Sequence, residues 1–373
     1  MTRSLVIIVS LLLAALAAGF VCEDELAKCL KRIDKGKKCQ GLPLPDNLLP
    51  PVTVDAKGYN LTEYRKGVYS VGESQYFMMI VKTSSQLIVV DGPEGNFLIR
   101  DANGVPIGTT LTDAIKEIAG DTKFKRIKII YSHQHYDHIG AVPFIYSYLE
   151  TAYPKAQIKI LAHSAILKPL INGDRPGFPL PTVLFDKKKV LKLRRNLKVI
   201  IKPQCGGHTP SDLIIHIPKT SGGVGVAYLV DVIFPRWAPP YNLAIVTDIH
   251  EYIELHSRIL ALDIEVYIGG HFTHVGTYQD VLAAKAYLED LLAASAEGLA
   301  VSSSTPLPAF FDVMDPSSRW WGNLSHFVKD FTEAGVAVCS RIMIEKWGCR
   351  LGGVDIWVDA HCESIINFLR LDN

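Results

Sequence analysis

One short segment of the sequence holds three histidines and an aspartate within six residues. It reads His133-Gln134-His135-Tyr136-Asp137-His138. The apolar run at 127–132 predicts a buried strand before it, and residues 139–145 predict the start of a helix after it. Because the first two histidines are two residues apart, their side chains point the same way on an extended backbone. The aspartate and the third histidine follow where the chain turns, an arrangement that suits two adjacent metal ions. Imidazole and carboxylate together favour zinc or iron over calcium or magnesium.

Three further residues of types that bind metals follow apolar runs later in the chain, namely His208, Asp231 and His271. Together with the first segment, they resemble the metallo-β-lactamase superfamily. Its His-x-His-x-Asp-His motif matches 133–138, and its later histidine, bridging aspartate and last histidine match the three downstream positions in the right order. The resemblance covers about residues 66 to 295.

The resemblance implies a two-metal site. One ion would be bound by His133, His135 and His208, the other by Asp137, His138 and His271, with Asp231 bridging both. The expected ions are two Zn²⁺, with iron or manganese as alternatives. Such a pair lowers the pKa of a shared water to about 7, which gives a bridging hydroxide at neutral pH. Asp137 is the expected catalytic residue, because it would orient this nucleophile or receive a proton.

The implied activity is hydrolysis of a small molecule that carries a carbonyl ester, lactone, thioester or amide. The aspartate at 231 departs from the antibiotic-cleaving members, which usually have cysteine or serine there, so β-lactamase activity is not expected. The ligand set resembles that of glyoxalase II-like enzymes. Two alternatives stay open: a phosphodiester or sulfate ester hydrolase using the same site, and a catalytically inert secreted metal-binding protein.

Other residues near these motifs are candidates for supporting roles. Asp91, at the end of an apolar run, resembles the family's aspartate that supports the metal loop by hydrogen bonding, and we interpret it as a supporting residue and not a ligand. Arg236 and Trp237 follow the bridging aspartate and are candidate substrate contacts. His274 is a candidate for the pocket or for ligand support. Cys205 is expected to be a buried residue at a strand end.

Strand and helix patterns surround these motifs. Apolar runs at 67–71, 76–81 and 86–91 predict an antiparallel meander. Residues 112–119, 247–260 and 278–292 have helical patterns, and further strands are predicted in between. Two sheets face to face with helices outside, a four-layer αββα sandwich, is the α/β architecture that both the pattern and the resemblance imply.

Four segments are expected along the chain. Residues 1–21 have one arginine, an apolar run and then small residues, as in a secretory signal peptide. Residues 22–65 form an extended lead-in rich in cysteine and proline. Residues 66–295 form the catalytic domain. Residues 296–373 form a helical extension, with helices over 324–347 and 360–371 and a strand over 354–358.

Secretion is supported by the cysteines. Six of seven lie in two groups near the ends of the chain, which predicts disulfides that fasten the ends, with the pairing open. The sequons at Asn60 and Asn323 predict a glycoprotein. No stable membrane insertion is expected once the signal is removed.

The formal net charge of +1 indicates no polyelectrolyte partner. The basic residues at 187–195 are expected to form a solvated hairpin whose charges protect a sheet edge, rather than a nucleic-acid site.

Overall fold

The computed structural model describes residues 22–39, 41–46, 48, 53–54, 56–73, 75–173, 177–272, 274–304, 313–319 and 321–372. The predicted signal peptide, residues 1–21, lies outside them. The chain forms two compact units. We call Pro50–Pro235 with Val246–Leu282 the sheet unit. The helical unit comprises the described parts of Met1–Leu49, Arg236–Ile245 and Ala283–Asn373.

The larger sheet of the sheet unit has the strand order β1-β2-β3-β4-β7-β8-β9. The first four strands pair antiparallel, as the predicted meander requires, and β4, β7, β8 and β9 pair parallel. Every residue of β4 is buried, which explains the continuous apolar run that follows Gln86. The strands are β1 (Asn60–Arg65), β2 (Val68–Gly72), β3 (Phe77–Lys82), β4 (Gln86–Val90), β7 (Arg126–Ile130), β8 (Gln157–His163) and β9 (Val183–Phe185).

The second sheet has five strands in the order β10-β11-β12-β13-β14, and its last pair is parallel. Its edge strand β10 pairs with β11 as a hairpin in which Lys192 lies opposite Lys198, and this confirms the predicted basic hairpin at a sheet edge. A small third sheet pairs β5 (Leu98–Arg100) with β6 (Pro106–Thr109). The strands of the second sheet are β10 (Lys189–Arg194), β11 (Leu197–Pro203), β12 (Leu213–Ile217), β13 (Val226–Tyr228) and β14 (Val266–Ile268).

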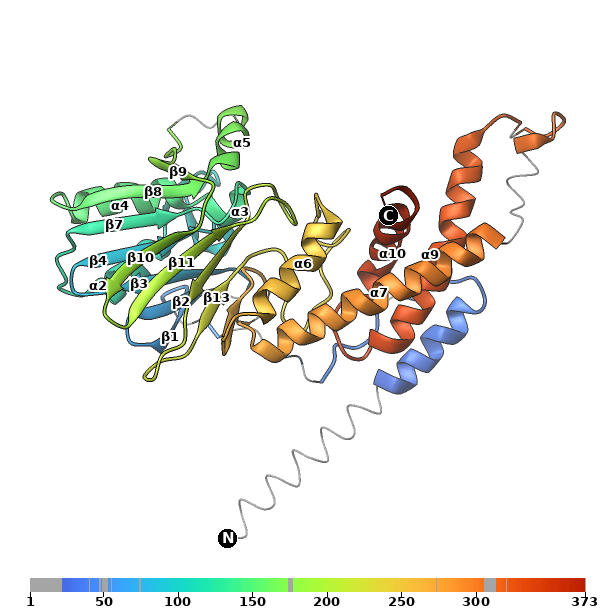
Figure 1. Ribbon diagram of the computed structural model, residues 1–373, viewed down its shortest axis with the longest axis horizontal. Helices are drawn as coiled ribbons and strands as arrows, with labels where there is room; N and C mark the ends of the chain where they lie inside the picture. The colour runs from blue at the N-terminus through green and yellow to red at the C-terminus, as the bar shows by residue number, and fades with distance from the viewer. Residues whose placement is uncertain are drawn as a thin grey trace, which may run out of the picture. The chain divides into compact units, whose positions relative to one another are not determined.

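Two apolar cores hold these layers together. One lies between the two sheets and includes Val90, Ile130 and Tyr228. The other lies between the larger sheet and the helices α2 (Leu111–Ala119) and α4 (Val142–Ala152). Figure 1 shows both helices beside the strands of the larger sheet. The helix α6 (Ile249–Leu260) connects the parallel strands β13 and β14. The predicted αββα class is confirmed.

Shorter elements follow the strands of the sheet unit. The segment that follows β7 and carries the histidine motif, which we call the metal loop, contains the single turn α3 (Tyr136–Ile139). The stretch between β8 and β9 contains η2 (Ser164–Ile166) and α5 (Leu167–Asn172). The 3₁₀ turn η1 (Gly95–Phe97) follows β4. Phe178, between α5 and β9, has its ring centroid 6.2 Å from that of Tyr136. The stretch between β8 and β9 therefore contacts the metal loop.

The helical unit contains α9 (Leu324–Trp347), α10 (Val354–Leu371) and most of α7 (Tyr278–Ser304), which is longer than the predicted 278–292. The predicted strand over 354–358 is wrong, because these residues begin α10. Gly353, with φ of 75°, precedes this helix, and the buried positions Val354, Val358 and Cys362 recur at helical spacing. This burial overrides the local preference of β-branched residues for strands.

The predicted extended lead-in is wrong over residues 22–33, which form a helix. Acidic residues in its first turn and basic residues in its last turn favour this helix electrostatically. Six cysteines form the disulfides Cys22–Cys349, Cys29–Cys39 and Cys339–Cys362, which confirms the prediction that disulfides fasten the ends. Cys205 is free and exposed, so its predicted burial is wrong. Its neighbour Gln204 is buried instead.

His361 is a buried polar anchor inside the helical unit. Its Nδ1 lies 2.8 Å from the Tyr287 hydroxyl, and its Nε2 lies 2.8 Å from the Pro239 carbonyl oxygen. Burial lowers the pKa of His361 from 6.5 to about 4. The ring is therefore neutral at pH 7, with its Nε2–H donating to Pro239 and its Nδ1 accepting from the tyrosine. Across the part of the chain that the structure covers, no helix is long and apolar enough to cross a membrane.

We expect His361 to make the folded protein acid-sensitive. Its folded pKa is below the unfolded value, so its contribution is complete above pH 6.5 and is lost as the pH falls toward 4. The loss is about 3 kcal/mol over this window. Urea unfolding at several pH values should show a smaller acid-dependent loss for His361→Gln than for the wild type. An equal loss in both proteins would contradict this assignment.

Ile129, in the central strand β7, is fully buried. Ile129→Ala should therefore lower the free energy of unfolding by about 2–5 kcal/mol. The same substitution at Ile171, which is 59% exposed, should change it by less than about 0.5 kcal/mol. Urea unfolding of both variants measures this difference. Similar losses at both positions would contradict the central place of β7 in the core.

Candidate metal centre

The structure brings all seven predicted ligands together in the sheet unit, in two groups. One group is His133, His135, His208 and Asp231, and the other is Asp137, His138, His271 and Asp231. Within each group, one ligand atom per residue lies within 4.8 Å of all the others. Asp231 belongs to both groups.

These side chains come from strand ends. The first two histidines follow β7, and Asp137 and His138 lie in α3 directly after them. His208 lies in the loop after β11. Because β13 and β14 are parallel neighbours, their carboxyl ends lie at the same edge of the sheet, and Asp231 and His271 follow these two ends.

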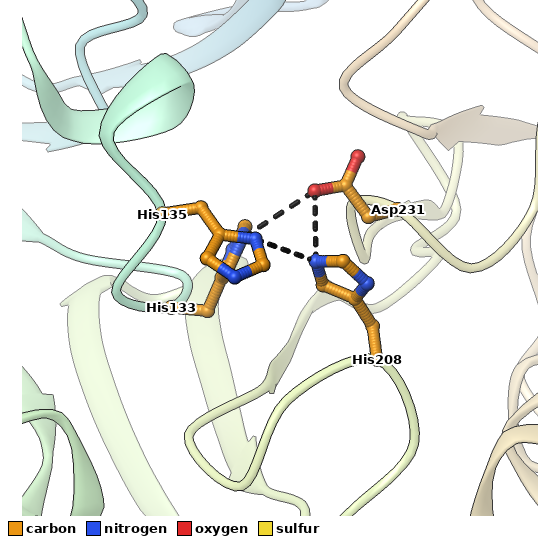
Figure 2. Close-up of side chains that lie close together, drawn as sticks. All are labelled: His133, His135, His208 and Asp231. Carbon is orange, nitrogen blue, oxygen red and sulfur yellow. Dashed lines mark hydrogen bonds and ion pairs between the residues drawn. The ribbon is translucent and has the colours of Figure 1, made fainter. Parts of the chain in front are cut away.

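The first group has a tight arrangement of imidazoles around one carboxylate oxygen. Figure 2 shows three histidines and Asp231 pointing toward one another. His208 Nε2 lies 2.8 Å from His135 Nδ1 and 3.3 Å from Asp231 Oδ2. His133 Nε2 lies 3.4 Å from the same oxygen.

The second group uses both oxygens of the same carboxylate, Oδ1 facing His271 and Oδ2 facing His138. His271 Nε2 lies 2.8 Å from Asp231 Oδ1 and 3.2 Å from Asp137 Oδ2. His138 Nε2 lies 2.9 Å from His271 Nε2 and 3.0 Å from Asp231 Oδ2. Asp231 therefore offers an oxygen to each group, which is what a bridging ligand must do.

The backbone at Asp231 is in the left-handed region, with φ of 62°. Such a conformation is uncommon for a residue other than glycine, although aspartate tolerates it better than most. Its N–H donates to the Gly269 carbonyl oxygen at 3.2 Å, so the loops after β13 and β14 are joined there. The neighbouring strand therefore holds the shared carboxylate in place.

Burial and charge act against each other in this cluster. Burial lowers the pKa of His133 to about 3, so its ring is neutral. Burial also opposes a charge on His271, but the carboxylates of Asp231 and Asp137 outweigh it and raise the pKa of His271 to about 10. The same carboxylates raise the pKa of His138. Burial alone would raise the pKa of Asp231, but the two imidazoles His138 and His271 hold it well below its usual range.

The residues present fit a pair of metal ions. His133 Nε2 is buried and has only a long contact of 3.4 Å to Asp231 Oδ2, whereas its Nδ1 is bonded to the Ser132 hydroxyl at 3.0 Å. Ligand atoms around one tetrahedral zinc ion lie about 3.3 Å apart, because each bond is about 2.0–2.1 Å long. The observed separations of 2.8–3.4 Å within the first group are close to this value.

Asp91 lies directly after β4, and its buried side chain braces the metal loop. Its Oδ1 accepts a bond from the Ser132 N–H at 2.7 Å, and its Oδ2 accepts one from the Tyr228 hydroxyl at 2.7 Å. Burial raises its pKa to about 6. The next residue, Gly92, donates to the His138 carbonyl oxygen at 2.8 Å. This loop therefore fixes the backbone on both sides of the histidine motif.

A second brace joins the two early ligand loops. The Ser211 hydroxyl bonds to the Gln134 side chain, which lies between the first two histidines. Asp212 is buried and accepts bonds from the N–H and hydroxyl of Thr209, which follows His208 directly. No local pattern in the sequence signals this brace, since hydroxyl and amide residues are common in loops.

The remaining predicted site residues, Trp237, Arg236 and His274, lie in different parts of the structure. Trp237 belongs to the helical unit, where its ring packs against Gly352 and residues 237 and 352 form an isolated parallel bridge. Arg236 belongs to the same unit and has a φ of 63°. His274 is buried in the sheet unit. Substrate contact by these residues stays a prediction.

Tyr76 is a residue near the cluster that the sequence analysis did not single out. Its ring centroid lies 4.7 Å from that of His271 and 6.1 Å from that of His138. Burial, followed by the charges of Asp137 and Asp231, raises its pKa to about 12. In the sequence it is one aromatic residue at the start of an apolar run, and nothing there signals its proximity to a histidine almost two hundred residues later.

Several solved structures are similar to this chain in fold. The stereoselective inverting sec-alkylsulfatase Pisa1 from Pseudomonas sp. has 15% sequence identity and a TM-score of 0.50, over 84% of this chain and 50% of that chain. A double mutant of that enzyme gives a TM-score of 0.51 at the same identity and coverage. BJP-1, a subclass B3 metallo-β-lactamase of Bradyrhizobium japonicum, has 16% identity and a TM-score of 0.41, over 62% of this chain and 91% of that chain.

The chain has the metallo-β-lactamase fold, and its histidine and aspartate cluster fits a dinuclear metal site. It spans about half the length of the alkylsulfatase. No family model and no curated protein matches the sequence.

Asp91→Ala should weaken both the fold and metal binding, because it leaves the buried Ser132 N–H and Tyr228 O–H without this acceptor. The expected loss is about 2–5 kcal/mol in the free energy of unfolding, with metal affinity about 10- to 100-fold lower. Tyr228→Phe removes one of the two bonds and should cost about 1 kcal/mol. Urea unfolding of metal-free protein and competition with a chelator measure the two effects. Asp91→Ala with wild-type metal affinity would contradict this bracing role.

Proposed function

We propose that this protein is a secreted hydrolase that uses two metal ions to cleave a small molecule. One observation carries the proposal: the carboxylate of Asp231 is shared by two groups of ligand atoms, one oxygen lying against His208 and the other against His271. A purely structural zinc site is usually closed, rich in cysteine and occupied by one ion. Neither group contains a cysteine.

The proposed ions are two Zn²⁺. The first would be held by His133, His135 and His208, the second by Asp137, His138 and His271, and Asp231 would bridge them. When bound, such a pair supplies Lewis acidity and lowers the pKa of water toward neutrality. Nitrogen and carboxylate donors without sulfur suit zinc, and they also suit iron and manganese.

The protein's own side chains would position the reactants. Asp137 is suited to orient the attacking water or accept its proton, since its side chain is 38% exposed while the other carboxylate, Asp231, is only 6% exposed. The braces through Asp91 and Ser211 would keep the imidazoles in one geometry when the substrate binds. Arg236 and Trp237 remain our candidates for substrate contacts, and His274 for pocket support.

The proposed substrate is a carbonyl ester, lactone, thioester or amide. Asp231 supports a substrate other than a β-lactam, because the antibiotic-cleaving members of the superfamily usually carry cysteine or serine at the corresponding position. A sulfate or phosphate ester is the second candidate, and the likeness of fold to an alkylsulfatase over 84% of the chain favours testing a sulfate ester. An inert metal-binding protein is the alternative outside enzymes.

Three disulfides support secretion, because such bonds persist in oxidising compartments. We propose that residues 1–21 act as a signal peptide. We also propose glycosylation at the sequons of Asn60 and Asn323. Asn323 is exposed, and its side chain accepts a hydrogen bond from the N–H of His326 at the start of α9.

Purified protein should contain two metal ions per chain and hydrolyse at least one member of an ester panel. The panel comprises 4-nitrophenyl acetate, γ-butyrolactone, an acyl thioester, 4-nitrophenyl sulfate and bis(4-nitrophenyl) phosphate. Asp231→Asn should bind fewer than two ions and lose activity at least about 100-fold, because both groups lose a charged oxygen. Metal analysis and initial rates measure these effects.

The matched control is Asp263→Asn, since that side chain is 78% exposed and lies outside both groups. It should keep wild-type metal content and activity. Two bound ions without turnover of any panel member would favour the inert metal-binding protein.

A further inference from the structure

Tyr76 is held beside the second ligand group by backbone bonds. It pairs with His271 in an isolated antiparallel bridge, and the next residue, Phe77, donates its N–H to the Gly270 carbonyl oxygen at 3.0 Å. The segment before β3 and the loop after β14 are therefore joined at the point where the last ligand lies. Both segments belong to the sheet unit.

The ring of Tyr76 forms a wall of this group. It is tilted by 54° against the ring of His271 and meets that of His138 edge-on at 68°. Gly95 leaves room for it, since a Cβ there would lie 2.6 Å from the tyrosine Cδ2, and its φ is +28°. Contacts with His271, His138 and Gly95 thus fix the position of the ring.

The hydroxyl of Tyr76 differs from those of the buried tyrosines. Tyr228, Tyr252 and Tyr267 each donate to a partner, the carboxylate of Asp91 or a backbone carbonyl. The hydroxyl of half-buried Tyr76 makes no hydrogen bond with any residue that the structure describes. Among the charged groups around it, the carboxylates Asp137 and Asp231 act on it most strongly. The tyrosine ring that lies 4.7 Å from the His271 ring therefore carries a hydroxyl with a hydrogen-bond donor to spare.

We propose that Tyr76 is a catalytic residue that donates a hydrogen bond to the leaving oxygen of the substrate beside the second ligand group. This inference rests on the proposed function. In ester cleavage the acyl carbon–oxygen bond breaks, its electron pair passes to the leaving oxygen, and the attacking water supplies the hydroxyl and the proton of the two products. The Tyr76 O–H stabilises the charge that develops on that oxygen and keeps its own proton.

A ring that only shields His271 is the competing explanation, and deletion of the hydroxyl alone separates the two. Tyr76→Phe keeps the ring. If Tyr76 acts on the leaving oxygen, this variant should lose about 10- to 100-fold in kcat with ethyl acetate, and clearly less with 4-nitrophenyl acetate. The difference arises because a poor leaving group develops charge that needs more stabilisation. KM should change little, and metal content should equal that of the wild type.

Tyr153→Phe is the matched control, because this tyrosine is half-buried and packs against Phe124, away from both ligand groups. It should match the wild type with every ester. Tyr76→Ala removes the ring as well and should also lower metal retention in a chelator competition. Equal losses in Tyr76→Phe for good and poor leaving groups would overturn the proposed role.

Binding of inorganic phosphate gives a readout that needs no turnover. Calorimetry with the metal-loaded protein should show binding about 5- to 10-fold weaker in Tyr76→Phe than in the wild type, because one hydrogen bond to an anion is lost. Equal affinity in the two proteins would overturn the inference. If the wild type hydrolyses no panel ester, the proposed function fails, and the phosphate comparison still decides whether Tyr76 donates to an anion at this site.

Discussion

Burial of the Asp231 carboxylate is the constraint on which the rest of this site depends. Its oxygens lie 2.8–3.4 Å from nitrogens of four imidazoles, and the residue is 4% exposed. A charge so far from water is costly unless positive partners compensate it. Protons on His138 and His271 or metal ions can provide that compensation, and they compete for the same nitrogens. The buried carboxylate therefore requires either protons or metal ions on the surrounding imidazoles.

The fold meets this constraint by placing ligands at the ends of strands from both sheets. The density of histidines marks the first motif in the sequence, and the resemblance to the superfamily points to the three later residues. The same regularity made the αββα layers predictable, because strands such as β4 are buried over their whole length. Local pattern and tertiary position agree in these elements.

Prediction failed where a distant part of the chain decides the local structure. The segment 354–358 has residues that favour strands, but it becomes helical because one face is buried in the helical unit. Cys205 was expected inside, yet Gln204 takes the buried position and leaves the thiol exposed. No local pattern marks Tyr76 as a site residue, since a backbone bridge to the distant His271 places it there. Such pairings cannot be read from neighbouring residues.

The bond between Cys22 and Cys349 closes a covalent ring of the chain across a sequence separation of 327 residues. Any single proteolytic cut within that ring leaves the two fragments attached to each other. A nicked molecule would then run as one species on a denaturing gel and separate into two only after reduction. In a protease-rich environment, this linkage allows one surface loop to be cleaved without releasing half of the protein.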